Sequence, residues 1–395
     1  MTTRQIDSRA GQSRLPSLTG MRFIAALLVF LTHASVAKAF TDQGIDSFMG
    51  TYLSRAGFLG VGFFFVLSGF VLTWSARPAD RTGRFYRRRF FKVYPNHLVT
   101  WFVGLLLMIK VGTDLTATAT VPSLLLVQSW VPNLTALGGT NGPSWSLACE
   151  ALFYLSFPLL LRLVKRIRAE RLWLWVALLT VGFFAVPLVS QLLPGTPLSP
   201  WQPVSMLRYW FVYFLPATRL LDFALGILMA RIVQTGRWIG LSWPTALLLL
   251  AGGYALMVYL PDSYGLVAPT ALPVALLIAA AAVQDVKGER TPFAGRRMRW
   301  LGEISFAFYM VHFLVFQYGP LGLAATTSAG ARSWHTPTAL GMLAITLLLS
   351  VAFGWLLYRL VEQPAMRRFG HPARRPATAA PTGSTPVAVP TPAAD

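Results

Sequence analysis

Two ionisable side chains, Arg22 and His33, lie in one apolar stretch of the sequence, residues 20–38. Eleven residues separate them, which is about 16 Å along an α-helix and close to three full turns, so one helix face would carry both. Ionisable groups inside apolar segments are costly and mark functional sites. This face would offer a cation near one end and an imidazole deeper in the membrane. Alternatively, Arg22 extends to the membrane surface and His33 is an ordinary hydrogen-bonded residue between helices.

A carboxylate, Glu150, lies five residues into a second apolar stretch, residues 145–164. It needs a partner, because an unpaired buried charge is strongly destabilising. The order of the segments places His33 and Glu150 in the same half of a membrane, where they could meet. A carboxylate on one imidazole nitrogen leaves the other nitrogen as a proton acceptor. We therefore predict a catalytic pair in which His33 is the general base.

The most basic stretch, residues 84–95, contains Arg87, Arg88, Arg89 and Lys92. Guanidinium groups grip phosphates through charge-assisted hydrogen bonds, so this stretch could clamp an anionic donor such as coenzyme A. The same charges would also follow from the preference of Lys and Arg for the cytoplasmic side and for anionic lipid. Charge alone leaves both interpretations open.

The composition is that of a membrane protein. Of the 395 residues, 55% are hydrophobic and 12% are charged, against about 25% charged residues in soluble domains. The net charge of +20 is distributed in short clusters between apolar segments, whereas nucleic-acid binding would need a contiguous basic face. No nucleic-acid partner is predicted. Cys149 is the single cysteine, and the five histidines lack HExxH spacing, so no disulfide and no metal site is predicted.

The apolar pattern predicts an all-α, polytopic bundle of about ten transmembrane helices, each needing about 20 apolar residues. Connections rich in Lys and Arg alternate with connections such as residues 113–144, which contain neither. Basic connections face the cytoplasm, which places both termini there. The expected spans are residues 20–38, 57–76, 93–112, 145–164, 172–193, 215–234, 241–260, 267–284, 301–320 and 338–359.

The chain divides into a cytoplasmic arm (1–16), a membrane domain (17–368) and a Pro-, Ala- and Thr-rich tail (369–395) that we expect to be disordered. Two apolar segments, 121–131 and 205–213, are too short to span and should lie at an interface or fold back into the bundle. The main alternative to an enzyme is a transporter with Arg22, His33 and Glu150 as relay groups. A transporter would more often show repeat symmetry, and the sequence has no internal repeat.

Six motifs, taken in order, resemble those of the membrane acyltransferase 3 family of O-acyltransferases. Arg22 and His33 match the family's signature of Arg, ten residues and His, and Glu150 lies in a segment similar to WSLxxExxFY. Lys92 stands where arginine is usual, and Phe306 departs from the late motif. Each motif is weak alone, but their order is specific. They cover residues 15–34, 60–70, 87–95, 143–154, 302–312 and 361–364.

The resemblance implies an acyltransferase that takes acetyl-CoA or a longer acyl-CoA from the cytoplasm as co-substrate, with no permanently bound cofactor. It implies that His33 is the catalytic base and Glu150 its partner. Five basic residues are expected donor contacts: Arg22, Arg87, Arg88, Arg89 and Lys92. Five further motif residues are expected substrate contacts: Ser68, Trp145, Tyr154, Tyr309 and His312.

The acceptor is the least defined part of the prediction. Members of the family acylate surface polysaccharides, lipid-linked sugars, peptidoglycan and natural products such as macrolides. The opening at residues 16–23 and the short tail resemble the natural-product branch. The predicted reaction is acyl transfer to a hydroxyl of a natural product, as in macrolide-type antibiotic tailoring, or of a cell-envelope sugar. The expected location is the lipid of a bacterial plasma membrane, and the oligomeric state stays open.

Overall fold

The computed structural model describes residues 15–77, 81–195, 197–199, 202–323 and 333–369. Helices dominate these residues, as predicted for an all-α bundle. The sheet within them is one antiparallel pair of short strands, β1 (Pro197–Ser199) and β2 (Gln202–Ser205). Residues 1–14 of the predicted N-terminal arm and residues 370–395 of the predicted tail lie outside the described residues, whereas Pro16 begins α2 and Phe369 ends α16.

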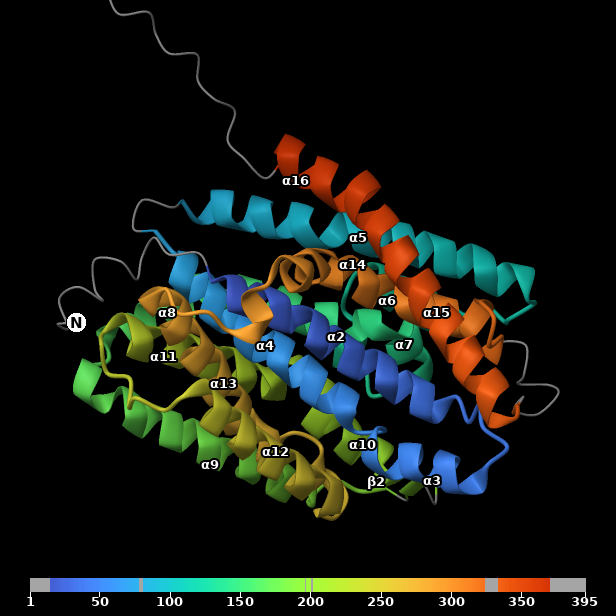
Figure 1. The fold of residues 1–395 in the computed structure, drawn as a ribbon, viewed down its shortest axis with the longest axis horizontal. Helices are drawn as coiled ribbons and strands as arrows, with labels where there is room; N and C mark the ends of the chain where they lie inside the picture. The colour runs from blue at the N-terminus through green and yellow to red at the C-terminus, as the bar shows by residue number, and fades with distance from the viewer. Residues whose placement is uncertain (1–14, 78–80, 196, 200–201, 324–332, 370–395) are drawn as a thin grey trace, which may run out of the picture.

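All ten predicted spans are helical, and most of the long helices run in a common direction (Figure 1). These ten are α2 (Pro16–Val36), α4 (Ala56–Ser75), α5 (Thr82–Lys110), α8 (Trp145–Arg166), α9 (Leu172–Ser190), α11 (Pro216–Gln234), α12 (Trp243–Tyr259), α13 (Ala268–Lys287), α14 (Arg296–Tyr318) and α15 (Thr336–Leu357).

Among the described residues, eight helical segments are long and apolar enough to cross a membrane. The two predicted spans outside that group are α5, whose first half is the basic stretch, and α12, which is apolar but has only 17 residues. A multi-pass helical bundle is therefore confirmed, while length and composition support eight of the ten predicted crossings.

The short apolar segments form small elements beside the long helices. Residues 121–131 belong to α6 (Ala117–Leu124) and to the 3-10 turn η1 (Gln128–Trp130), followed by α7 (Leu134–Gly138) and η2 (Gly142–Ser144). Residues 205–213 form α10 (Met206–Tyr209) and the π-helical turn η4 (Trp210–Phe214), which lead into α11. The remaining short elements are α3 (Gln43–Tyr52), η3 (Ala169–Arg171), η5 (Asp262–Gly265), η6 (Pro292–Ala294), η8 (Tyr358–Glu362) and α16 (Gln363–Phe369).

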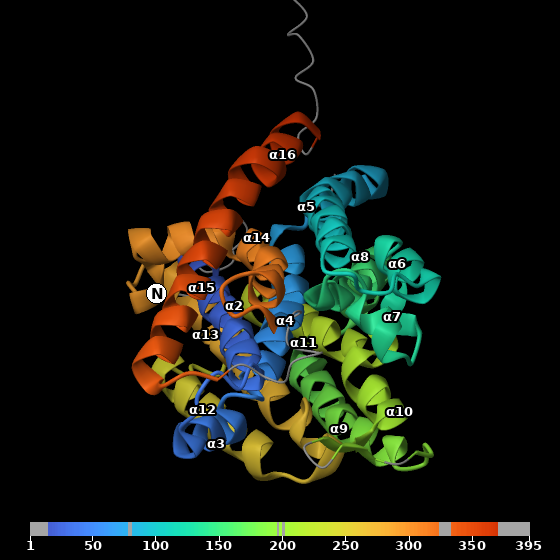
Figure 2. The same cartoon turned by 90° about the vertical axis from the view of Figure 1, so that its right-hand side faces the viewer.

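Helices α2, α4 and α11 form the centre of the bundle, as the end-on view in Figure 2 shows. Two glycines let α4 and α11 approach closely. A Cβ atom added at Gly69 would lie 2.0 Å from the Phe223 carbonyl oxygen, and one added at Gly226 would lie 2.0 Å from the Val66 carbonyl oxygen. Small residues at such crossings are typical of membrane helices, where backbone contact replaces the hydrophobic effect as the source of stability.

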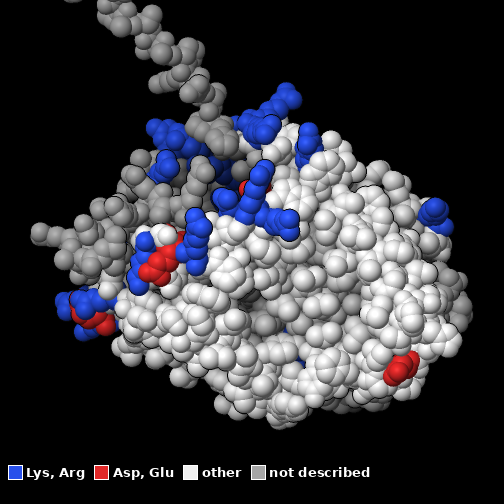
Figure 3. Space-filling view, viewed as in Figure 1, with Lys and Arg blue, Asp and Glu red and all other residues white. Residues whose placement is uncertain are grey.

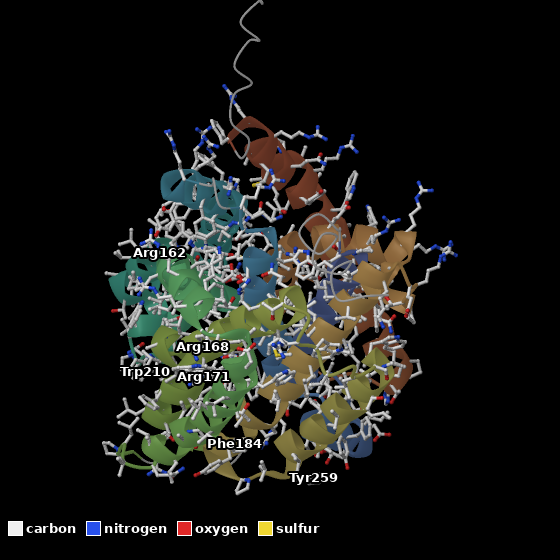
Figure 4. The ribbon with its side chains drawn as sticks, turned by 90° about the vertical axis from the view of Figure 1, so that its left-hand side faces the viewer. Arg162, Arg168, Arg171, Phe184, Trp210 and Tyr259 are labelled. Atoms are coloured by element: carbon white, nitrogen blue, oxygen red, sulfur yellow. The ribbon has the colours of Figure 1, made fainter. Side chains whose placement is uncertain are left out.

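Basic residues gather at one end of the bundle. They occupy the start of α5, the α8–α9 connection and the α13–α14 connection, and most of the remaining surface in Figure 3 carries neither Lys nor Arg. Arg162, Arg168 and Arg171 of this group lie at the end of α8 and in the connection to α9 (Figure 4). The bundle thus has a basic end, which the charge pattern predicts to be cytoplasmic. Helix α8 starts at the opposite end.

Candidate active site

A cavity of about 270 Å³ lies near the basic end, between α2, α4, α5, α8 and α14. Its charged lining residues are Arg22, Arg89, Lys92 and Glu150. We call it the basic cavity. Three of the five predicted donor contacts therefore come together from two helices that are distant in the sequence, and they face a single carboxylate.

Glu150 is held inside this cavity by a neighbour on its own helix. The Tyr154 hydroxyl, one turn further along α8, donates a hydrogen bond of 2.7 Å to the Glu150 carboxylate. The Arg89 guanidinium lies 6.0 Å from the centre of the Tyr154 ring. Ser68 of α4 lines the same cavity. Two predicted substrate contacts, Ser68 and Tyr154, thus belong with the predicted donor contacts.

Lys92 connects the basic cavity to the end of the membrane domain. Its ammonium group forms an ion pair with Glu362, whose side chain is only 1% exposed. The Asn96 amide donates a second hydrogen bond, of 2.6 Å, to the same carboxylate. Glu362 belongs to the closing motif at residues 361–364. Its two partners on α5 explain the motif: they hold η8 and α16 against the helix that supplies Arg89.

Arg87 and Arg88 do not line the basic cavity. The Arg87 guanidinium instead donates a hydrogen bond of 2.9 Å to the Phe369 carbonyl oxygen at the end of α16. Of the arginine run at 87–89, only Arg89 reaches the cavity, since successive residues of a helix point about 100° apart.

A larger cavity of about 1100 Å³ lies at the opposite end of the same helices. It is lined by His33 of α2, Trp145 of α8 and Tyr309 of α14, together with residues of α3 and α7. We call it the histidine cavity. Trp145 and Tyr309, both predicted substrate contacts, therefore lie beside the predicted base rather than beside the predicted donor contacts.

His33 is hydrogen-bonded to a second histidine. Its Nδ1 lies 3.0 Å from Nε2 of His312, and Nδ1 of His312 lies 2.7 Å from the Tyr309 carbonyl oxygen. A carbonyl oxygen only accepts, so His312 Nδ1 carries a hydrogen and donates it. In a neutral His312, Nε2 must then accept the bond from His33 Nδ1. This series of hydrogen bonds assigns the hydrogen of a neutral His33 to Nδ1 and leaves its Nε2 as a proton acceptor.

The predicted pairing of His33 with Glu150 is wrong. The His33 ring is bonded to His312, and Glu150 is bonded to Tyr154 in the other cavity. The prediction placed both residues in the outer half of the membrane, but α8 carries Glu150 well past its first turn and toward the basic end. The hydrogen-bond partner of His33 is His312, which is fully buried and lines neither cavity.

Sequence reasoning placed His312 in a motif but missed its role. The available signal was that the late motif at residues 302–312 ends on a histidine within an apolar helix. The same motif supplies Tyr309, whose hydroxyl donates to the Pro143 carbonyl oxygen at 3.1 Å and lies 3.0 Å from the Ser146 hydroxyl. These bonds join α14 to the start of α8, so the motifs at 143–154 and 302–312 build one site.

Comparisons with known proteins identify the family of this chain. The acyltransferase domain profile matches residues 15–359. The chain is 42% identical to Acyltransferase MdmB of Streptomyces mycarofaciens, over 94% of this chain and 96% of that protein. It is 26% identical to the peptidoglycan O-acetyltransferase OatA of Listeria monocytogenes, over 56% of this chain and 35% of that protein. It is 23% identical to the putative peptidoglycan O-acetyltransferase YrhL of Bacillus subtilis, over 89% of this chain and 54% of that protein. No solved structure matches it.

The profile match begins before Arg22 and ends three residues before Glu362, so it contains both cavities and the histidine pair. The transporter alternative is thereby set aside, because the family profile is that of an acyltransferase domain and all three relatives are named as acyltransferases or O-acetyltransferases. With eight apolar helices long enough to cross a membrane, the chain belongs to the acyltransferase 3 family and is a multi-pass membrane O-acyltransferase.

Proposed function

We propose that this enzyme moves an acetyl group from acetyl-CoA, taken up at the basic cavity, to a hydroxyl of an acceptor bound in the histidine cavity. The observation that carries this proposal is that four helices, α2, α4, α8 and α14, each line both cavities. On α2 the two functional residues are Arg22 and His33, about 16 Å apart along the helix axis. An extended thioester arm held at the basic end would point along the helix toward the base.

Support for the donor comes from the charges of the basic cavity. Arg22, Arg89 and Lys92 offer hydrogen-bond donors to phosphate groups, and Arg forks suit them best. The cavity, at about 270 Å³, is small for a whole coenzyme A, so the nucleotide would lie at the open basic end with only the arm inside. Glu150 would then accept a hydrogen bond from an amide N–H of that arm.

The reaction follows from the tautomer of His33. Its Nε2 takes the proton of the acceptor hydroxyl as the oxygen attacks the thioester carbonyl carbon. The tetrahedral intermediate collapses, the carbon–sulfur bond breaks, and the coenzyme A thiolate leaves. The His33 imidazolium then returns the proton to sulfur, giving the thiol and an ester. His312 holds the ring through Nδ1 throughout, as the orienting group of a general base does.

For the acceptor we propose a natural product of macrolide size. The histidine cavity of about 1100 Å³ is slightly larger than the usual range for small-molecule sites, about 300–1,000 Å³. The relative that this chain matches over nearly its whole length is not named for peptidoglycan, whereas the two that are so named match over 35% and 54% of their length. A cell-envelope sugar is the second candidate, favoured by those two names. The proposed location is the bacterial plasma membrane.

The experiment uses the protein in lipid nanodiscs with radiolabelled acetyl-CoA. One arm adds a macrolide with a free sugar hydroxyl, and the other adds soluble peptidoglycan fragments. Label in the macrolide supports the proposal, and label in the fragments alone moves the enzyme to the cell-envelope branch. His33→Ala should lower turnover per inserted molecule by about 10²–10⁴-fold, the usual contribution of a general base. Near-normal turnover in His33→Ala would overturn the mechanism.

The role of His312 is tested in the same assay. Removing it leaves the His33 Nδ1–H unpaired, at a cost of about 1–3 kcal/mol. In the transition state this cost lowers kcat by about 5- to 150-fold. His312→Ala should therefore lower kcat and leave the acetyl-CoA KM unchanged. His312→Gln should recover part of the loss, because its amide oxygen can accept the same bond. An equal drop in kcat in both variants, or a rise in the acetyl-CoA KM with kcat unchanged, would exclude an orienting role.

A further inference from the structure

The two cavities share no lining residue, so a septum separates them. Phe64 of α4 lines the basic cavity and Tyr309 of α14 lines the histidine cavity. Their rings meet edge to face, with centroids 5.9 Å apart. Phe306, one turn before Tyr309, also lines the basic cavity. The contact between Phe64 and Tyr309 therefore joins a residue that lines the basic cavity to a residue that lines the histidine cavity.

The two residues of this septum, Phe64 and Tyr309, are held in place by different kinds of contact. The Tyr309 hydroxyl is fixed by the Pro143 carbonyl oxygen and the Ser146 hydroxyl. The Tyr309 carbonyl oxygen accepts the His312 bond that sets the tautomer of His33. Any displacement of Tyr309 would disturb the base. The Phe64 side chain has no polar atom and is held by packing alone. Its ring can therefore be replaced without breaking the hydrogen bonds that join Tyr309, His312 and His33.

We propose that Phe64 is the residue that determines the length of the acyl group the enzyme transfers. This rests on the proposed function, since it assumes that the thioester arrives from the basic cavity and reacts at His33. The carbonyl carbon must then pass the Phe64 ring with its acyl chain attached. With the carbonyl carbon at His33, the acyl chain lies against the Phe64 ring, so a larger side chain at position 64 leaves room for fewer carbons. Phe64 thus selects the length of the acyl group, and the histidine pair carries out the proton transfer.

The test is a series at this position, Phe64→Trp, Phe64→Leu and Phe64→Ala, assayed with acetyl-, butyryl- and octanoyl-CoA. One methylene group in an apolar site changes specificity by about 10- to 200-fold. The ratio of kcat/KM for butyryl-CoA to that for acetyl-CoA should rise by about 10-fold or more from Phe to Ala, and it should fall in Phe64→Trp. Val71→Ala is the control, because it widens the basic cavity on the same helix, about two turns from the septum.

The outcomes separate this inference from the proposed function. A ratio that follows the size of residue 64, and is unchanged in Val71→Ala, supports it. Inserted variants that keep the wild-type chain-length profile would refute the role of Phe64 and leave the proposed function standing. Failure of the wild type to use any acyl-CoA would instead refute the proposed function. If Phe64→Ala does not insert, the Trp and Leu variants still decide, because they bracket the native side chain in size.

Discussion

At the scale of single residues, neighbouring arginines in one basic run have different surroundings. Arg89 lines the basic cavity and lies over the Tyr154 ring, while Arg87 binds the Phe369 carbonyl oxygen on α16. The sequence left two interpretations of this run open, a phosphate clamp and a topology signal. The two residues differ in position: Arg89 lines the cavity at which we propose that the donor binds, and Arg87 does not.

This difference gives a matched pair of variants. Arg89→Ala should raise the acetyl-CoA KM by about 10-fold or more, because a charge-assisted phosphate bond contributes about 1.5–3 kcal/mol. Arg87→Ala removes one positive charge from the same run and should leave KM within about twofold, since surface charges away from such features contribute little. Both KM values are measured on inserted protein. Equal effects in the two variants would show that the run acts through charge alone.

Sequence reasoning identified the chemistry-bearing residues better than it identified their partners. Sequence analysis singled out Arg22, His33 and Glu150 because ionisable groups stand out in apolar segments. It singled out Arg89 because this residue lies in the most basic stretch. The partner of His33 was missed because the depth of a residue in a membrane follows from its helix's start and tilt, which apolar length does not specify. Glu150 was assigned to His33 from membrane depth and from the family resemblance, but in the structure His33 hydrogen-bonds to His312, 279 residues away in the sequence.

At the scale of elements, the crossing of α4 and α11 fixes the part of the bundle that carries Phe64. Gly69 and Gly226 each face the backbone of the other helix, with added Cβ atoms 2.0 Å from a carbonyl oxygen. The apolar pattern predicted both helices but gave no signal for which glycines make this contact. Gly252 of α12, by contrast, has no atom within 4 Å of an added Cβ.

Two substitutions of the same chemistry should therefore have opposite effects. Gly226→Ala must push α4 and α11 apart, and overpacking of this kind costs about 1–3 kcal/mol or more. Gly252→Ala should be neutral or stabilising, because Ala is favoured over Gly inside a helix by about 1 kcal/mol. The thermal midpoint Tm in detergent measures both. A Tm for Gly226→Ala equal to that of Gly252→Ala would show that the crossing tolerates a methyl group.

At the scale of the whole molecule, the proposed function depends on the two cavities lying at opposite ends of shared helices. The sequence predicted the basic end through the alternation of Lys and Arg, and the structure places Arg22, Arg89 and Lys92 near that end. The existence of the histidine cavity could not be predicted. Its lining comes from α3, α7 and α14, which are far apart in the sequence. Contacts between such segments cannot be predicted from the local amino-acid composition.

The last prediction concerns which end faces the cytoplasm. Thr135 of α7 is exposed beside the histidine cavity, and Glu289 is exposed after α13 at the basic end. In a Cys149→Ser background, Thr135→Cys should react with a membrane-impermeant maleimide in intact cells. Glu289→Cys should react only after lysis, because basic connections stay in the cytoplasm. Neither substitution removes a positive charge, so the topology signal is preserved. The reverse labelling pattern would place the basic cavity outside, away from cytoplasmic acyl-CoA, and would refute the proposed route of the acyl group as well as the orientation.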